Sequence, residues 1–172
     1  MQVFPTRSAS SSSRPSSTPS SRTASPSSPM DTTKSKGLKI VLVEDDDGHA
    51  ILIQRSLRPL RPDNQIVRVS NGQQAVDYLF HEHEDVEPTV VFLDLNLPIL
   101  DGYQVLARLK GDQKTRKIPV VVISTTDDSR EMERCYELGA NAYISKPLEF
   151  KTFSHTMKSL GQFLSVVSIP AT

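Results

Sequence analysis

The stretch VVFLDLNLPILDG, residues 90–102, decides the fold of this 172-residue chain. Four apolar residues lead to one carboxylate, Asp94, and a proline and an Asp-Gly pair follow shortly behind it. Continuous apolar runs of this kind are typical of strands covered on both faces, as in a parallel sheet between two layers of helices. The segment therefore predicts a buried strand that carries an acid at its carboxyl end.

Working outward from this strand, short runs rich in Val and Ile alternate with helical patterns. The predicted strands are residues 39–43, 65–69, 89–93, 119–123 and 141–145. The predicted helices lie near residues 47–58, 72–83, 102–111, 128–138 and 149–164, and the last shows an apolar stripe of Phe150, Phe153, Met157, Leu160 and Leu164. Five strand–helix units predict an α/β fold, a doubly wound five-stranded parallel sheet with right-handed crossovers.

Composition divides the chain into parts. Residues 1–30 contain 12 serines and 5 prolines, and such a segment buries too little apolar surface to offset the entropy of ordering. We therefore expect a disordered segment over residues 1–37, one globular domain over residues 38–165 and a short tail over residues 166–172.

Charge and apolar content exclude several classes of function. Residues 38–172 carry 15 basic and 19 acidic side chains, and because a nucleic-acid surface needs clustered positive charge, we expect no nucleic-acid partner. No apolar run is long enough to span a bilayer, so we expect no membrane association. The single cysteine, Cys135, suits a reducing compartment, and we predict a cytoplasmic location.

Polar groups stand at the carboxyl ends of four predicted strands. They are Glu44, Asp45 and Asp46 after the first strand, Asp94 after the third, Ser124, Thr125 and Thr126 after the fourth, and Lys146 with Pro147 after the fifth. The second strand ends in Ser70, Asn71 and Gly72, and we expect it to bring no ionisable group. This pattern fits the strand order 2-1-3-4-5, in which strands 1, 3, 4 and 5 open onto one crevice.

The groups at these strand ends have complementary chemistry. Crowded carboxylates repel one another, so a proton or a cation must compensate them, and Mg²⁺ prefers such oxygen ligands. The Lys146 ammonium can bind a phosphate oxygen, and Asp94 can act as a nucleophile that forms an acyl phosphate. The set therefore indicates phosphoryl transfer.

Each group also has a plainer interpretation. Asp46 or Asp47, the segment 124–128 and the Asp101-Gly102 pair can simply cap or start helices. Four strand ends with complementary groups are hard to explain by capping alone. His81 and His83 lie in an acidic, solvated connection without further metal ligands, and His49 and His155 are isolated. Cys135 is expected to be a packed thiol.

These residues closely resemble the receiver domain of two-component response regulators, the CheY-like family. The resemblance covers residues 38 to about 165, and the motifs that carry it are LVEDD at the first strand end, LDLNLPILDG around Asp94, VISTT at the fourth and GANAYISKP at the fifth. It implies a flavodoxin-like (βα)5 fold and a phosphorelay protein with no enzymatic turnover of its own.

The resemblance assigns a role to each matching position. Asp94 matches the aspartate that accepts the phosphoryl group, and it shares a Mg²⁺ site with Glu44, Asp45 and the backbone carbonyl of Asn96. Lys146, Ser124 and Tyr143 match the residues that bind the phosphoryl group and switch the face formed by the fourth helix, fifth strand and fifth helix. Pro98 and Gly102 match a loop that shapes the site, and the bond from Lys146 to Pro147 is expected to be cis.

A finer resemblance concerns stand-alone regulators associated with bacterial phytochromes. Its carriers are the connection YLFHEHEDVEPTVVFLDLNLP, the segment ELGANAYISKP and the tail SVVSIP. It implies a sensor histidine kinase, with a bacterial phytochrome as one candidate, or a phosphotransfer protein as partner. It also implies a homodimer, to which Phe163, Leu164, Val166, Val167 and Ile169 could contribute unless they pack on their own domain.

The same residues allow three rival interpretations. An aspartyl-phosphate phosphatase needs a second aspartate as acid/base two residues after the nucleophile, but that position is Asn96. A flavin-binding module would need a Ser/Thr-rich loop where this chain has EDDDG. A receiver-like module that binds a partner without phosphorylation remains as the third alternative.

Overall fold

The computed structural model describes residues 37–60, 63–82, 87–167 and 169. In chain order the elements are β1 (Lys39–Val43), α1 (Asp47–Leu57), the 3-10 turn η1 (Arg58–Leu60), β2 (Gln65–Val69), α2 (Gly72–Asp77), the π-helical turn η2 (Tyr78–Glu82), β3 (Thr89–Leu93), α3 (Gly102–Gly111), β4 (Val120–Ser124), α4 (Ser129–Glu137), β5 (Ala142–Ser145) and α5 (Phe150–Val166). The predicted disorder over residues 1–37 falls outside the described residues, Gly37 excepted, and stays a prediction.

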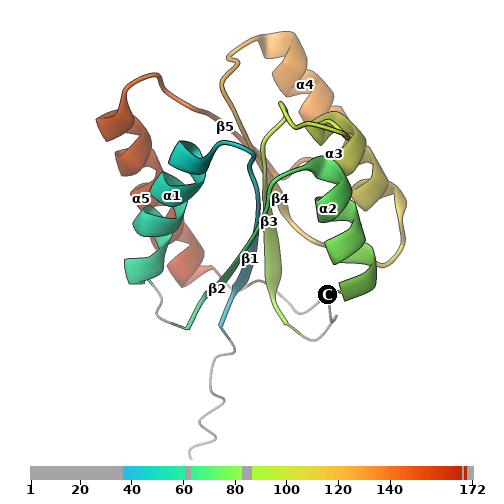
Figure 1. Ribbon diagram of the computed structural model, residues 1–172, viewed down its shortest axis with the longest axis horizontal. Coiled ribbons are helices and arrows are strands. Elements are labelled where there is room, and N and C mark those ends of the chain that lie inside the picture. Colours follow the sequence, from blue (N-terminus) through green and yellow to red (C-terminus); the bar gives the residue numbers. More distant parts are fainter. Residues whose placement is uncertain (1–36, 61–62, 83–86, 168, 170–172) are drawn as a thin grey trace, which may run out of the picture. The chain divides into compact units, whose positions relative to one another are not determined.

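The five strands form one parallel sheet in the order β2-β1-β3-β4-β5, as predicted. β3 lies in the middle, where it pairs with β1 on one side and β4 on the other (Figure 1). All five residues of β3 are buried. The apolar run that precedes Asp94 is therefore the central strand of the sheet.

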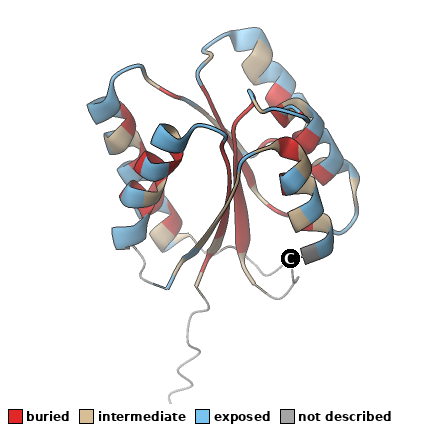
Figure 2. Ribbon diagram, viewed as in Figure 1, coloured by how far each residue is buried: buried red, intermediate tan, exposed pale blue. Residues whose placement is uncertain are grey.

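Helices cover both faces of the sheet. α1 and α5 lie on one face, and α2, α3 and α4 lie on the other (Figure 1). Successive residues of β1 alternate between the two layers, because Ile40 and Leu42 pack with α1 and α5 while Val41 and Val43 pack with the other three helices. This double burial explains why the strands lack polar alternation (Figure 2).

Short polar side chains begin four of the helices. The carboxylates or amides of Asp46, Asn71, Asp101 and Asp128 accept hydrogen bonds from the first-turn N–H groups of α1, α2, α3 and α4. Asp101 forms a capping box with Gln104. The capping interpretation of Asp46 and Asp101 is thus confirmed, and neither residue has to act in the site.

The α5 stripe was predicted correctly except at its start. Phe153, Met157 and Leu164 are buried, and Leu160 packs partly against the same core. Phe150 is 67% exposed because it is the first residue of α5, ahead of the turns that pack on the sheet. α5 also continues to Val166, so the first residue of the predicted tail is still helical.

The bond from Lys146 to Pro147 corrects another expectation. The described residues contain no cis peptide bond, so this bond is trans rather than cis. For a residue that precedes proline the trans form is the lower in free energy by about 0.5–1 kcal/mol, and only a specific local environment reverses that preference.

Within the described part of the chain, no helix is long and apolar enough to cross a bilayer.

Candidate acidic site at the carboxyl edge of the sheet

Three carboxylates meet where β1 and β3 end. Asp94 follows β3, and its N–H donates to the carbonyl of Val43 at 3.0 Å, so the residue lies beside Glu44 in the neighbouring chain segment. One oxygen each from Glu44, Asp45 and Asp94 lies within 4.8 Å of the others. The parallel sheet thus brings together two segments that are 50 residues apart in sequence, as the strand-end argument predicted.

The ammonium of Lys146 bridges the two buried acids. Its Nζ atom donates to Glu44 Oε2 at 2.7 Å and to Asp94 Oδ2 at 2.6 Å. Glu44, Asp94 and Lys146 are only 1%, 6% and 5% exposed, whereas Asp45 is exposed. The lysine is positioned from β5, because its own N–H donates to the carbonyl of Ser124 at the end of β4.

Burial has the largest effect on the pKa of the Glu44 carboxyl group. Removal of Glu44 from solvent raises the pKa of its carboxyl group, even though the hydrogen bond and the charge of Lys146 act in the opposite direction. The charge of Asp94 also raises this pKa. One ammonium against three carboxylates leaves a surplus of negative charge among oxygen donors, and this donor set fits a hard divalent ion such as Mg²⁺.

The loop from Leu95 to Gly102 folds tightly against the acid. The Asn96 N–H donates to Asp94 Oδ1 at 3.3 Å, while the Asn96 side chain is exposed. A Cβ atom on Gly102 would lie 2.3 Å from the carbonyl oxygen of Asp94, so only glycine allows this close approach. Ile99, next to Pro98, adopts a positive φ of 71° and is 80% exposed.

Ser124 and Tyr143 line the other side of the crevice. β4 pairs with β3 at Leu93 and Val122, which places Ser124 just beyond the level of Asp94 at the buried end of β4. The N–H of Thr126 approaches Ser124 Oγ at 3.5 Å. The half-buried Tyr143 hydroxyl donates to the carbonyl of Thr126 at 3.0 Å, and burial raises the pKa of this tyrosine.

Comparison with known protein families identifies the family of this chain. A family model described as the response regulator receiver domain matches residues 40–158, which include every predicted site residue. The chain belongs to the response regulator receiver family. Receiver domains are signalling modules that interact with histidine kinases or phosphotransfer proteins.

Three solved receiver structures are similar over most of the chain. The receiver domain from Rhodospirillum rubrum is 42% identical, with a TM-score of 0.73, and covers 78% of this chain and 98% of its own. The phosphorylated cyanobacterial phytochrome response regulator RcpA is 36% identical, with a TM-score of 0.72, and covers 78% and 99%. The Mn²⁺-bound form of response regulator Rcp1, a Synechocystis protein, is 32% identical, with a TM-score of 0.71, and covers 77% and 99%.

Two residues of this receiver domain approach the acids although sequence reasoning set them aside. His49, expected to be isolated, lies in the first turns of α1 with Nδ1 3.6 Å from both Glu44 Oε1 and Asp46 Oδ1. Arg68 reaches the same strand end from β2, which was expected to bring no ionisable group. The sequence carries no local signal for these two residues, because it is the turn of α1 and the register of β2 that bring them close to the acids.

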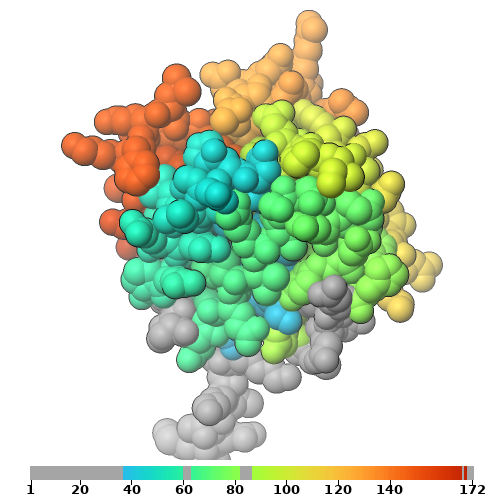
Figure 3. Space-filling model, in the orientation of Figure 1, coloured from blue at the N-terminus to red at the C-terminus, as the bar shows by residue number. Residues whose placement is uncertain are grey.

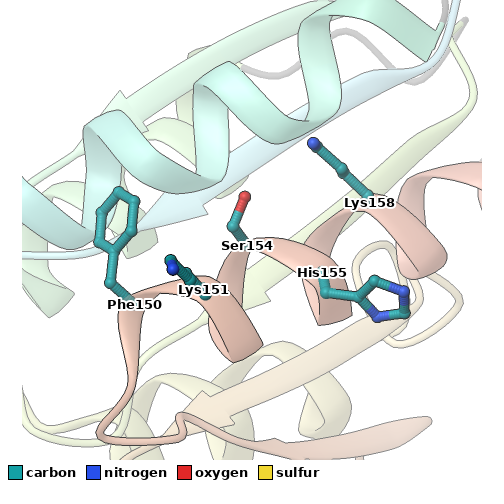
Figure 4. Close-up of a pocket in the computed structure, with 5 residues that line it drawn as sticks. All are labelled: Phe150, Lys151, Ser154, His155 and Lys158. Atoms are coloured by element: carbon teal, nitrogen blue, oxygen red, sulfur yellow. The ribbon is translucent and has the colours of Figure 1, made fainter.

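Other candidates stay outside the receiver site. Cys135 is buried in the core as a packed thiol, and burial raises its pKa. His81 lies exposed in η2, and His83 falls outside the described residues. His155 lines a surface hollow of about 320 Å³ on α5 together with Phe150, Lys151, Ser154 and Lys158 (Figure 4), which includes no residue of the predicted set.

Proposed function

We propose that this receiver domain accepts a phosphoryl group on Asp94 from a phosphohistidine of a histidine kinase or phosphotransfer protein. The observation that carries the proposal is the position of the Asp94 carboxylate, held 2.6 Å from Lys146 and within 4.8 Å of the other two acids. A nucleophile, a cation-binding pair and a fixed positive charge then act on one phosphoryl group.

In this transfer an Asp94 oxygen forms a bond to phosphorus while the bond from phosphorus to the histidine nitrogen breaks. The imidazole leaves with the electron pair of that bond. Bound by Glu44, Asp45, Asp94 and the carbonyl of Asn96, a Mg²⁺ ion would neutralise negative charge on the carboxylates and on the phosphoryl oxygens. Lys146 is already beside Asp94 and would hold a phosphoryl oxygen.

The same geometry suggests how the added charge is sensed. Ser124 ends β4 beside the site, and Tyr143 is tied to the β4–α4 connection through Thr126. We propose that the Ser124 hydroxyl moves onto the phosphoryl group, and that Tyr143 responds, so that the α4–β5–α5 face changes population. Gly102 keeps the opposite loop close to Asp94, and within that loop the carbonyl of Pro98 accepts a hydrogen bond from the N–H of Leu100.

For the partner we propose a cytoplasmic sensor kinase, with a phytochrome as the favoured class. The support is the similarity to RcpA and Rcp1 over more than three quarters of the chain.

We also propose a homodimer, because Phe163 and Val166 leave apolar side chains exposed near the end of α5, whereas Leu164 is buried in the domain's own core. Sedimentation of the Phe163→Asp variant as a dimer equal to wild type would contradict that part.

The rival functions remain weaker on the same residues. A phosphatase needs an acid near Asp94 to activate water, and at the second residue after it the chain has Asn96, whose amide has no acid–base role at neutral pH. A module that only binds a partner has no need for three acids with oxygens within 4.8 Å of one another and a lysine hydrogen-bonded to two of them. Phosphoryl acceptance uses all four groups.

One experiment tests the proposal. The chain is incubated with acetyl phosphate with and without Mg²⁺, and the intact mass is measured for wild type, Asp94→Asn and the control Asp77→Asn, which changes an exposed acid on α2. We expect an acid-stable, base-labile phosphoryl adduct on wild type and Asp77→Asn only when Mg²⁺ is present. The absence of that adduct on the wild-type chain would sink the proposal.

A further inference from the structure

A guanidinium from β2 contacts three acceptors at the end of β1. Arg68 Nε donates to the carbonyl of Glu44 at 3.1 Å, Nη2 donates to the carbonyl of Asp45 at 3.2 Å, and Nη1 donates to the Asp47 carboxylate at 2.7 Å. The Arg68 side chain is 25% exposed. All three acceptors therefore belong to the short segment that carries two of the proposed metal ligands.

The hydrogen bonds of Arg68 connect β2 to the segment after β1, beyond the last backbone pair of these two strands. The β1–β2 ladder ends at the pair of Val43 and Val69, and the Glu44 N–H still donates to the Val69 carbonyl at 3.1 Å. From there the side chain of Arg68 supplies the donors, because β2 leads away into the Ser70–Asn71 turn and α2 (Figure 1). In the space-filling view the cyan atoms of α1 lie beside green atoms of the β2–α2 region (Figure 3). A planar guanidinium suits two neighbouring carbonyls better than a point charge does.

We infer that Arg68 is a positioning residue, which fixes the peptide units of Glu44 and Asp45 so that their carboxylates converge on one divalent cation. This inference rests on the proposed Mg²⁺ site and adds a residue that the family resemblance did not assign. Asp45 depends on the contact most, because its side chain is exposed and packing does not hold it. Glu44 is also held by Lys146.

The sign of the effect separates positioning from simple electrostatics. Arg68 is a cation near a site for another cation, so Coulomb repulsion alone predicts that its removal tightens Mg²⁺ binding. Loss of positioning predicts the opposite, because groups that orient metal ligands typically contribute 10–100-fold to metal affinity. A loss of general stability would change the melting temperature but leave the affinity of the folded chain unchanged.

The test is a calorimetric Mg²⁺ titration of wild type, Arg68→Gln, Arg68→Lys and Arg55→Gln, with folding checked by circular dichroism. Arg55→Gln is the matched control, because it removes an exposed positive charge in the last turn of α1. We expect roughly ten-fold weaker binding for Arg68→Gln and wild-type affinity for Arg55→Gln. Arg68→Lys should lie in between, since an ammonium can still reach backbone carbonyls, as Lys110 does at Arg116 and Ile118.

Affinity of Arg68→Gln equal to or tighter than that of wild type overturns the inference, and so does an equal loss in Arg55→Gln. If Arg68→Gln does not fold, Arg68→Lys decides, with unchanged affinity counting against positioning. A wild-type chain that binds no Mg²⁺ defeats both the inference and the metal part of the proposed function. A wild-type chain that binds Mg²⁺ and is phosphorylated, beside an unaffected Arg68→Gln, defeats the inference alone.

Discussion

The ammonium of Lys146 lies 2.6 Å from Asp94 Oδ2 across 52 residues of sequence, and it contacts Glu44 at the same time. A single buried cation therefore stands between two buried acids. Each of these three residues is at most 6% exposed. Solvent contributes little to their charge balance, so the loss of one partner has to be compensated within the site.

Replacement of Lys146 by methionine tests this balance. It leaves two buried carboxylates without their cation, and breaking a buried ion pair on one side costs about 3–5 kcal/mol. We expect a loss of about 3 kcal/mol in the free energy of unfolding in Mg²⁺-free buffer, and a clearly smaller loss with Mg²⁺. Urea denaturation measures both. Lys151→Met, at an exposed position, should change neither value, and an equally mild effect at Lys146 would contradict the prediction.

The two glycines at the ends of α3 form a matched pair. A Cβ atom at Gly102 meets the Asp94 backbone at 2.3 Å, whereas one at Gly111 meets nothing within 4 Å. We expect Gly102→Ala to destabilise the fold by about 3 kcal/mol, because the backbone that carries Asp94 must move. Gly111→Ala should be neutral or stabilise by about 0.5 kcal/mol. Thermal denaturation of both variants checks the contrast, which similar melting temperatures would refute.

Ile99 predicts a stabilising substitution. A β-branched residue in the left-handed region is strained by about 1–2 kcal/mol, and Ile99 has φ of 71°. Asparagine tolerates this region, so we expect Ile99→Asn to stabilise the fold by about 0.5–1 kcal/mol. The control Ile51→Asn, in the regular helix α1 and also exposed, should destabilise instead. Guanidinium denaturation gives both signs, and destabilisation by Ile99→Asn would argue against strain.

Tyr103 predicts an alkaline limit to stability. Its hydroxyl is buried without a hydrogen-bond partner among the described residues, and burial, followed by the nearby charge of Glu131, raises the pKa of Tyr103 to about 12. Between the ordinary tyrosine pKa, about 10, and this value, the unfolded chain releases the proton while the folded chain keeps it. Folding stability therefore falls as pH rises through that window.

Tyr103→Phe removes both the buried hydroxyl and its titration. We expect it to stabilise the fold by about 1 kcal/mol at neutral pH, because an unpaired buried polar group is lost. We also expect a weaker fall in stability above pH 10, measured by urea denaturation from pH 8 to 11. Tyr136→Phe, at an exposed tyrosine, is the control. A steeper alkaline fall in Tyr103→Phe than in wild type would disprove the assignment.

Sequence patterns predicted the sheet because strands that are buried on both faces have mostly apolar sequences. A parallel strand such as β3 is buried throughout and apolar at four of its five positions, so its ends are easy to locate, and a side chain just beyond an end must lie at the shared edge. That logic found Glu44, Asp45, Asp94, Ser124 and Lys146. It could not show that Lys146 already bridges Glu44 and Asp94, because side-chain contact depends on rotamers that sequence does not display.

The same logic failed for residues that return to the site from within an element. Arg68 is the fourth residue of QIVRV and looks like an ordinary polar position on an edge strand. Its role comes from the register that pairs it with Leu42, two residues before Glu44. His49 likewise reaches Glu44 because α1 begins directly beyond the acids. Contacts of this kind follow from three-dimensional register rather than from local composition.

The central place of β3 has a consequence for how the domain moves. Its backbone pairs in register with β1 and β4 and is buried on both faces, so its amide protons should exchange with solvent only when the whole domain opens. Modification of Asp94 should therefore leave exchange in β3 unchanged. Faster or slower exchange should appear in the turns beyond the strand ends, over residues 95–102, 125–128 and 146–149, and on the α4–β5–α5 face, so that the centre of the sheet stays rigid while its carboxyl edge and this face respond.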